Sequence, residues 1–327
     1  MTAIFQTIPG ALVLLVIGFI FLIKGADFFV EGASAVAKKL HVPALVIGMT
    51  IVAMGTSLPE LSVSVTASIA GSNQLAIGNV VGSNIFNLMV VLGSCALLSS
   101  LQVTDITIKR DFPFSVICVV LLVVLGLVGG QVGHADGIIL LILFVGFLAM
   151  MLKTALKSRS DAAIEVLDDS NIVDIPTWLC IVYIVGGAIA IKFGGDWVVN
   201  SCTTLALKFG MSETLVGLTI VALGTSLPEL VTSMVAAKKN ELDMAIGNVV
   251  GSNVFNVLMI LGVAGTISPM TYLTVNAIDA AILIAFSLLV WIMCAKKKSL
   301  GRTNGIIMLA LYVAYIAYII IRDGGVA

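Results

Sequence analysis

The sequence predicts an all-α integral membrane protein with ten transmembrane helices, arranged as two inverted five-helix repeats with broken helices at the membrane midplane. Three observations predict this fold: the composition, the distribution of basic residues and an internal repeat. Of the 327 residues, 60% are hydrophobic and only 11% are charged, and the mean hydropathy is +1.17. Soluble domains carry about 25% charged residues, so much of this surface is expected to face lipid.

Long apolar runs supply the predicted spans, because a transmembrane helix needs about 20 predominantly apolar residues. The first run meets no charge before Lys24. It lacks the basic segment and the cleavage site of a signal peptide, so it counts as a span. The expected spans lie near residues 7–24, 42–70, 76–99, 112–131, 136–153, 177–199, 211–236, 244–268, 275–295 and 303–321.

Basic residues gather on one side of this predicted arrangement. If the loops alternate sides, 14 of the 17 lysines and arginines share a side, and only Lys192, Lys208 and Arg322 fall on the other. The side richer in basic residues faces the cytoplasm. The sequence therefore predicts a multi-pass protein of a bacterial or archaeal plasma or inner membrane, with both termini outside.

Two stretches of the chain repeat with a constant offset of 169 residues. Gly48–Glu60 (GMTIVAMGTSLPE) matches Gly217–Glu229 (GLTIVALGTSLPE), and Gly78–Asn87 (GNVVGSNIFN) matches Gly247–Asn256 (GNVVGSNVFN). Five spans per copy is an odd number, so the second copy enters the membrane from the opposite side. Inverted repeats of this kind are typical of secondary transporters, whose site lies where the repeats meet.

The repeat also divides the chain. We expect a first five-span repeat at residues 1–153, a polar cytoplasmic linker at 154–175 and a second five-span repeat at 176–327. The linker is acidic but has no EF-hand pattern, which favours a solvated connection over a regulatory Ca2+ site. The five cysteines and two histidines show no metal or disulfide spacing, and no cofactor is expected.

The first motif places one glutamate in mid-span in each repeat. Pro59 and Pro228 should break their helices and free backbone carbonyls. The pattern S-x-x-E also fits a helix capping box, which is the purely structural interpretation. A carboxylate at mid-bilayer costs at least ~2.5–3.5 kcal/mol, whereas a cap contributes about 0.5–2 kcal/mol. No basic residue lies deep in any expected span, so protons or dissolved cations must neutralise Glu60 and Glu229.

The second motif adds neutral oxygen atoms. Asn79, Ser83 and Asn87 are four residues apart and share one helix face, and Asn248, Ser252 and Asn256 match them. Gly78 and Gly82 are expected to allow close helix packing. Carboxylate, hydroxyl, amide and carbonyl oxygens form a site that hard cations such as Ca2+ and Na+ prefer, although the same atoms could hold protons. Competition between ions for one site gives exchange.

These paired motifs resemble the Ca2+/cation antiporter superfamily, in particular the sodium/calcium exchanger family and its bacterial inner-membrane members. The resemblance covers nearly the whole chain and implies a central cluster of four ion sites, with a sliding first helix in each repeat. It implies Ca2+ at Glu60, Glu229, Thr56 and Thr225, and Na+ shared among the surrounding oxygens. The implied cation ligands further include Ser57, Ser83, Ser226 and Ser252, with backbone carbonyls of Ala53, Thr56, Ala222 and Thr225. Asn87 and Asn256 are expected to join them because they recur in both halves together with the glutamates.

One position departs from the family pattern. Many members have aspartate where this chain has Asn256, so the stoichiometry and any K+ dependence stay open. The predicted function is Ca2+/Na+ antiport by alternating access, with an H+-coupled antiporter of Ca2+ or another cation as the alternative and a cation channel less favoured. An enzyme is not expected, because no H-E-x-x-H motif occurs and Phe193 interrupts a G-x-G-D motif. The expected partners are Ca2+, Na+ and the lipid bilayer, with no nucleic acid; the oligomeric state is open.

Overall fold

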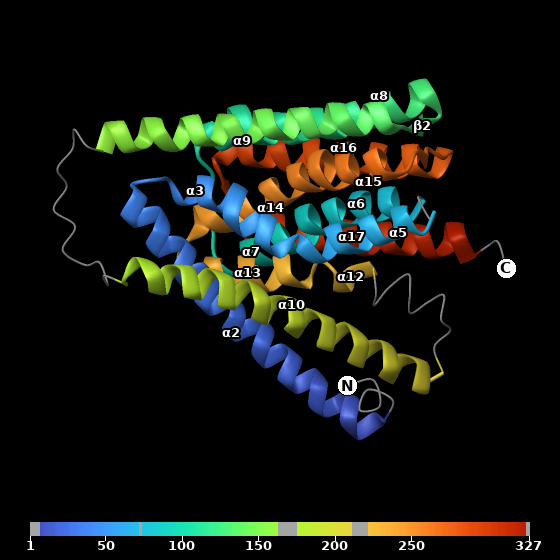
Figure 1. The fold of residues 1–327 in the computed structure, drawn as a ribbon, viewed down its shortest axis with the longest axis horizontal. Helices are drawn as coiled ribbons and strands as arrows, with labels where there is room; N and C mark the ends of the chain where they lie inside the picture. Colours follow the sequence, from blue (N-terminus) through green and yellow to red (C-terminus); the bar gives the residue numbers. More distant parts are fainter. Residues whose placement is uncertain (1–6, 72–73, 163–174, 211–221, 325–327) are drawn as a thin grey trace.

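The computed structural model describes residues 7–71, 74–162, 175–210 and 222–324. The described chain is helical apart from two short strand pairs, so the all-α prediction is confirmed (Figure 1). In chain order the elements are α2 (Ile8–Leu40), α3 (Ala44–Ile47), η1 (Gly48–Val52), α4 (Ala53–Thr56), α5 (Leu58–Ile69), α6 (Gln74–Phe86), η2 (Asn87–Val91), α7 (Leu92–Leu98), β1 (Leu101–Gln102), η3 (Thr107–Asp111), α8 (Phe112–Gly129), β2 (Gln131–Val132), α9 (His134–Ala162), α10 (Thr177–Lys208), α12 (Ala222–Gly224), α13 (Leu227–Lys238), α14 (Leu242–Phe255), η5 (Asn256–Ile260), α15 (Leu261–Ile267), β3 (Met270–Thr271), α16 (Thr274–Lys297), β4 (Ser299–Leu300) and α17 (Arg302–Gly324).

Eight helices in the described residues are long and apolar enough to cross a membrane. A ninth candidate is the pair Ala44–Thr56 and Leu58–Ile69, which bends by 49° at its break. The expected span at 211–236 includes residues 211–221, which lie outside the described residues. A multi-span helical protein is therefore confirmed, whereas the count of ten and the inverted arrangement in the membrane stay predictions.

The predicted ends of the first span in each half are wrong. The sequence placed them at residues 24 and 199, but α2 runs to Leu40 and α10 to Lys208. The two helices pack closely along their length, and a Cβ on Gly25 would lie 2.9 Å from the Ala190 Cβ. The charges on α2 also find partners, since Lys239 Nζ lies 2.7 Å from Asp27 Oδ1. The charged residues Lys24 and Asp27 do not end α2, because its packing against α10 continues beyond them.

The repeat in the sequence is matched by a repeat of secondary structure. The helices α5 and α13 have 12 residues each and begin 169 residues apart. The π-helical segments η2 and η5 begin at Asn87 and Asn256, with the same offset. Two antiparallel strand pairs join the halves, because β1 pairs with β4 and β2 with β3. The described parts of the two halves therefore share these elements and are joined by the strand pairs.

The glycine-rich helix α14 packs closely against a described neighbour. A Cβ on Gly251 in α14 would lie 2.5 Å from the Met49 Cα, so α14 and η1 meet backbone to backbone. Among the described residues, no atom lies within 4 Å of a Cβ on Gly78 or Gly82 in α6. The counterpart of η1 in the second half is residues 217–221, outside the described ranges. Close helix packing is therefore seen at α14, and the close packing expected at Gly78 and Gly82 in α6 stays a prediction.

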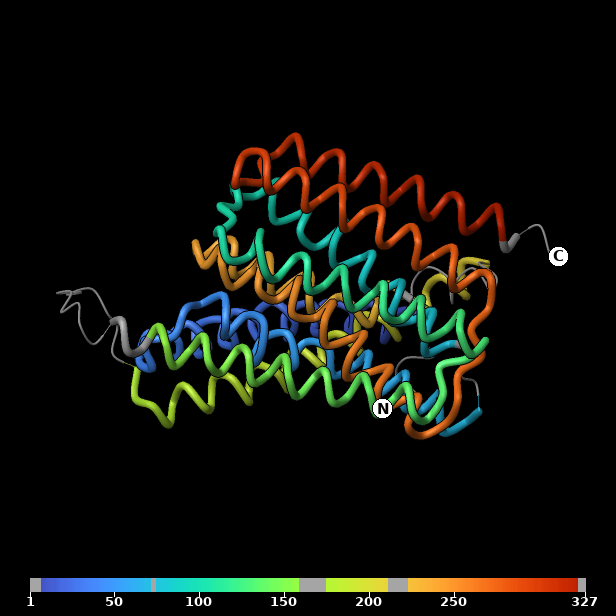
Figure 2. The backbone as a smooth tube through the Cα atoms, turned by 90° about the horizontal axis from the view of Figure 1, so that it is seen from above, coloured from blue at the N-terminus to red at the C-terminus, as the bar shows by residue number. Residues whose placement is uncertain are grey.

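The packed centre of the molecule lies around α14 and α6. Every residue of α14 from Met244 to Phe255 is buried. Figure 2 shows α16 and α17 along one flank of the molecule and α9 along the other. The end of α17 lies at one end of the long axis, and the end of α9 lies at the opposite end (Figure 1). The broken helices run between these ends, next to the buried centre.

Candidate cation site

Both predicted helix breaks are present at the first motif. Helix α4 ends at Thr56 and α5 begins at Leu58, and in the second half α12 ends at Gly224 and α13 begins at Leu227. A proline stands at the start of α5 and of α13, where its missing N–H costs nothing. Each break places a glutamate in the first turn of the helix that follows it. There the positive end of the helix dipole favours the ionised form.

The capping-box interpretation of these breaks is wrong. Ser57 and Ser226 occupy the N-cap positions, but neither side chain makes a cap hydrogen bond. Instead, Ser57 Oγ donates to Glu229 Oε1 at 2.7 Å, and Ser226 Oγ donates to Glu60 Oε1 at 2.8 Å. Each serine therefore bonds the glutamate of the other half. These crossed hydrogen bonds bring both predicted carboxylates into one site.

The serines of the second motif join the same site. Ser57 Oγ lies 3.1 Å from Ser252 Oγ, and Ser226 Oγ lies 3.1 Å from Ser83 Oγ. All four hydroxyl groups are buried. The central cluster thus comprises two carboxylates and four hydroxyls, contributed equally by the two halves. We call these six residues the serine–glutamate cluster.

Neither carboxylate in the cluster is balanced by a basic side chain among the described residues. Glu60 and Glu229 are both 0% exposed, and the Oε2 atom of each is buried without a hydrogen-bond partner there. The ion pairs in the described ranges lie elsewhere, as between Arg322 and Asp279. An ionised carboxylate that is buried without compensation is strongly unfavourable. The cluster therefore requires positive charge from outside the protein chain.

Threonine and carbonyl positions around the cluster differ between the halves. Thr56 Oγ1 lies 3.2 Å from Asn248 Oδ1, whereas Thr225 Oγ1 is buried with no hydrogen-bond partner in the described residues. The carbonyl of Ala53 accepts the N–H of Ser57 at 3.1 Å. The same oxygen lies 3.3 Å from Thr56 Oγ1, which can also donate to it. No contact is described for the carbonyl of Ala222.

Two serines that surround the cluster, Ser64 and Ser233, were missed by the sequence reasoning. Asn79 Nδ2 donates to Ser64 Oγ at 3.0 Å, and Asn248 Nδ2 donates to Ser233 Oγ at 2.9 Å. Ser64 and Ser233 stand 169 residues apart, so the repeat itself could have identified them. These bonds fix the orientation of the asparagines that face the cluster.

The asparagines at the centre of the molecule link the halves directly. Asn84 Nδ2 donates to the Asn253 carbonyl at 3.1 Å, and Asn253 Nδ2 donates to the Asn84 carbonyl at 3.3 Å. Asn256 Nδ2 donates to Asn84 Oδ1 at 3.0 Å, but both polar side-chain atoms of Asn87 are buried without a partner in the described part of the chain. The predicted ligands Asn87 and Asn256 are thus buried, and only Asn256 is bonded.

This difference predicts unequal effects of adding a carboxyl group at the two positions. In Asn256→Asp, the new oxygen would face the Asn84 Oδ1 acceptor and lose a hydrogen bond, whereas Asn87→Asp loses none. We expect Asn256→Asp to be the less stable variant by about 1–3 kcal/mol. Thermal unfolding in detergent, followed by intrinsic fluorescence, measures the difference. Both variants bury a new carboxyl, so equal stability would show that the Asn256 hydrogen bond is unimportant.

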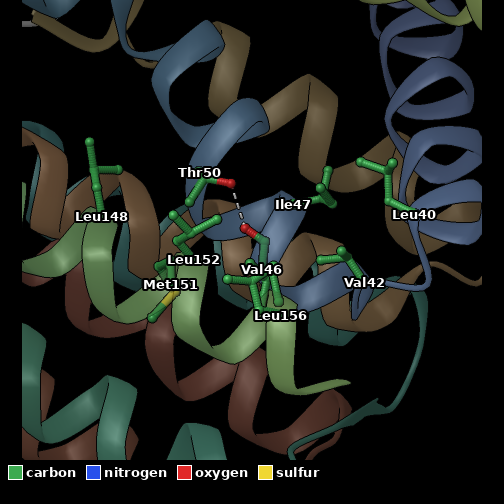
Figure 3. Close-up of a pocket in the computed structure, with 10 residues that line it drawn as sticks. Leu40, Val42, Val46, Ile47, Thr50, Leu148, Met151, Leu152 and Leu156 are labelled. Atoms are coloured by element: carbon green, nitrogen blue, oxygen red, sulfur yellow. Dashed lines mark hydrogen bonds between the residues drawn. The ribbon is translucent and has the colours of Figure 1, made fainter. Parts of the chain in front are cut away.

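Two cavities lie near the broken helices and differ in chemistry. One, of about 210 Å3, is lined by Pro59, Pro228 and Thr225 together with Asn200 and the ion pair of Lys192 with Asp196, and so adjoins the cluster with polar groups. The other, of about 330 Å3, lies between α3 and α9 and is apolar (Figure 3). Its one hydroxyl, on Thr50, donates to the Val46 carbonyl at 2.6 Å. The apolar cavity therefore does not offer cation ligands.

The family model described as "Sodium/calcium exchanger protein" matches residues 10–153 and 179–321 of this chain. The chain belongs to the sodium/calcium exchanger family. It is 32% identical over 343 residues to the sodium/calcium exchanger MaX1 of Methanosarcina acetivorans, covering 93% of this chain and 96% of that protein. It is 33% identical over 323 residues to the inner membrane protein YrbG of Escherichia coli, covering 94% and 96%.

Solved structures give the same result. The sodium–calcium exchanger NCX_Mj, soaked with 10 mM Na+ and zero Ca2+, matches with a TM-score of 0.83 and 32% identity, covering 95% of this chain and 99% of that chain. NCX_Mj soaked with 2.5 mM Na+ and 10 mM Sr2+ matches with a TM-score of 0.82 and the same identity. This exchanger is therefore a membrane cation antiporter of the Ca2+-exchanging type, and its family consists of transporters.

Proposed function

We propose that this exchanger carries out Ca2+/Na+ antiport by alternating access at the serine–glutamate cluster. The observation that supports this most strongly is the pair of buried carboxylates, each bonded by a serine of the other half and neither matched by a basic group among the described residues. Two carboxylates balance the charge of one Ca2+. Their unpartnered Oε2 atoms supply the anionic ligands that Ca2+ prefers.

The surrounding oxygens complete the proposed ion sites. Ca2+ is held by Glu60 and Glu229, with Thr56 and Thr225 beside them. Na+ shares the two glutamates and takes further oxygens from the four serines of the cluster, from Asn87 and Asn256, and from the carbonyls of Ala53 and Ala222. A serine hydroxyl can donate its hydrogen to a carboxylate and still offer an oxygen lone pair to a cation. The two ions therefore compete for the same carboxylates.

Coupling follows from the charge of the empty cluster. Moving a bare carboxylate through the low-dielectric centre of a membrane costs at least ~2.5–3.5 kcal/mol per group on insertion scales. A cluster loaded with Ca2+ or Na+ avoids this cost, whereas the empty cluster bears two such charges. The protein then changes access when loaded and resists the change when empty, which makes the flux of one ion depend on the other.

The proposed topology places the repeats in opposite orientations. Residues 1–153 and 176–327 form the two inverted repeats, and residues 154–175 form a cytoplasmic linker between them. Both termini then face outward. The matching offset of the helices, the π-helical segments and the crossed hydrogen bonds supports this arrangement.

Flux of 45Ca2+ into proteoliposomes tests the proposal, with the driving gradient as the variable. We expect uptake when Na+ is trapped inside and diluted outside, saturation with external Ca2+, and no uptake when choline replaces Na+. A second set of vesicles with an imposed pH gradient and no Na+ tests proton coupling. Adding K+ to the Na+-loaded vesicles tests whether K+ is a co-substrate.

Three outcomes would contradict the proposal. Uptake driven by the pH gradient alone would replace Na+ with H+ as the coupling ion. Uptake without any counter-ion, rising linearly with Ca2+, would indicate a channel. Absence of Ca2+ flux under every gradient, with 22Na+ exchange still present, would remove Ca2+ as the substrate.

A further inference from the structure

We propose that the ends of α8 and α9 nearest the linker form a binding site for the phosphate headgroup of an anionic phospholipid. A cavity of about 510 Å3 lies there, lined by the basic side chains of Lys109, Arg110 and Lys157, by the hydroxyls of Thr154 and Ser158, and by Asp105 and Ile106. The cavity is formed by η3 and the last turns of α9, which contribute no residue to the serine–glutamate cluster. Figure 1 shows the end of α9 at one end of the long axis.

Arg110 is held in place with one donor group unused. Its Nε donates to Asp111 Oδ1 at 2.7 Å, and its Nη1 donates to Thr154 Oγ1 at 2.8 Å. The Nη2 atom is buried and has no hydrogen-bond partner in the described part of the chain. A guanidinium that is fixed by two bonds loses little side-chain freedom when it binds a phosphate. This donor lacks an acceptor among the described residues, and an anionic oxygen bound in the cavity that Arg110 lines would supply one.

The cavity also carries an excess of positive charge. Lys109 and Lys157 are exposed, and neither forms an ion pair within 4.0 Å among the described residues. Among the described residues, the acidic groups at the cavity are already paired, because Asp105, which lines the cavity near Lys109, pairs with Lys298 at 2.7 Å and Asp111 pairs with Arg110. The Lys298 ammonium, through a hydrogen bond and its charge, holds the pKa of Asp105 below its usual range. Two lysines thus stay available for an anion.

The surroundings favour a lipid over a soluble phosphate. Ile106 lines the cavity with half of its surface exposed. Leu143 lies on α9 eleven residues before Thr154, which is about three helical turns, so it shares the cavity's face of that helix and is exposed. Basic pockets at the cytoplasmic ends of membrane helices suit anionic headgroups. A bound phosphate would leave its acyl chains along exposed apolar side chains of α8 and α9.

Lipid binding to the purified full-length chain in neutral detergent tests the site, by native mass spectrometry with dioleoylphosphatidylglycerol. The double variant Lys109→Gln/Lys157→Gln is expected to weaken binding by about 30-fold, at ~1 kcal/mol for each lysine. The matched control is Lys296→Gln/Lys297→Gln, which removes two exposed lysines at the end of α16 outside the cavity. The control is expected to bind within about twofold of the unaltered protein.

Several results would overturn the proposal. Unchanged binding by the cavity variant would do so, as would an equal loss in the control, which would reduce the effect to net charge. Equal binding of dioleoylphosphatidylcholine would remove the requirement for an anionic headgroup. Displacement of the lipid by a few millimolar inorganic phosphate would identify a soluble anion as the ligand. Arg110 is left unaltered because its loss would leave the buried Asp111 carboxyl without its partner.

Discussion

Replacing Glu60 with glutamine is expected to abolish Ca2+ transport in a protein that still folds. The substitution keeps the shape of the side chain and an oxygen for the Ser226 hydroxyl, but removes one of the two buried charges. At about 4 Å and an effective dielectric constant near 20, two unit charges attract by roughly 4 kcal/mol, or about 10^3-fold in affinity. A divalent ion loses still more. Glu229→Gln should have the same effect, because the two glutamates occupy equivalent positions.

The measurement is Na+-driven 45Ca2+ uptake, with Glu31→Gln as the matched control. Glu31 lies on α2, is partly exposed and shares Lys239 with Asp27, so it carries the same chemical change outside the cluster. We expect the control to keep uptake within about threefold of the unaltered chain, since exposed ion pairs contribute little. Normal uptake by Glu60→Gln would show that the buried carboxylate is not an essential ligand.

Replacing Gly187 with alanine is expected to cause a large loss of stability. The added Cβ would lie 2.7 Å from the Gly25 carbonyl oxygen and 2.8 Å from the Phe29 backbone nitrogen. Backbone atoms cannot rotate aside as a flexible side chain can, so α2 and α10 must separate. Overpacking of this kind costs about 1–3 kcal/mol or more. The melting temperature in detergent should fall, and transport should fall with it.

The neighbouring residue supplies the control. A Cβ on Gly186 meets no atom within 4 Å among the described residues, and alanine favours a helix more than glycine does. Gly186→Ala should therefore melt at or slightly above the temperature of the unaltered protein. If both variants melted at the same temperature, the close approach of α2 and α10 at Gly187 would not limit stability.

The sequence was most informative where a physical constraint acts locally. The position of Pro59 predicts the helix break, because proline removes a hydrogen bond wherever it occurs inside a helix. The ends of α2 and α10 were not predictable in this way. They depend on packing between two helices that are far apart in the chain, and on Lys239, which reaches Asp27 across the fold.

The candidate site shows the same division. The repeated motifs identified Glu60, Glu229 and the serines of the cluster, and the structure brings all of them together. The hydrogen bonds of the serines could not be predicted, because the pattern S-x-x-E also describes a helix cap. Only the three-dimensional arrangement shows that each hydroxyl bonds the glutamate of the other half. Ser64 and Ser233 were missed because their role depends on asparagines of a neighbouring helix.

The crossed serine–glutamate hydrogen bonds have a consequence for dividing the gene product. Cutting the chain within residues 163–174 would yield two fragments, each with a carboxylate whose hydroxyl partner lies on the other fragment. Neither fragment alone could assemble the centre, and producing both in one cell should restore it. Restored transport would then show that both fragments are present. Replacing Ser57 or Ser226 in one fragment would remove the hydrogen bond to the glutamate carried by the other.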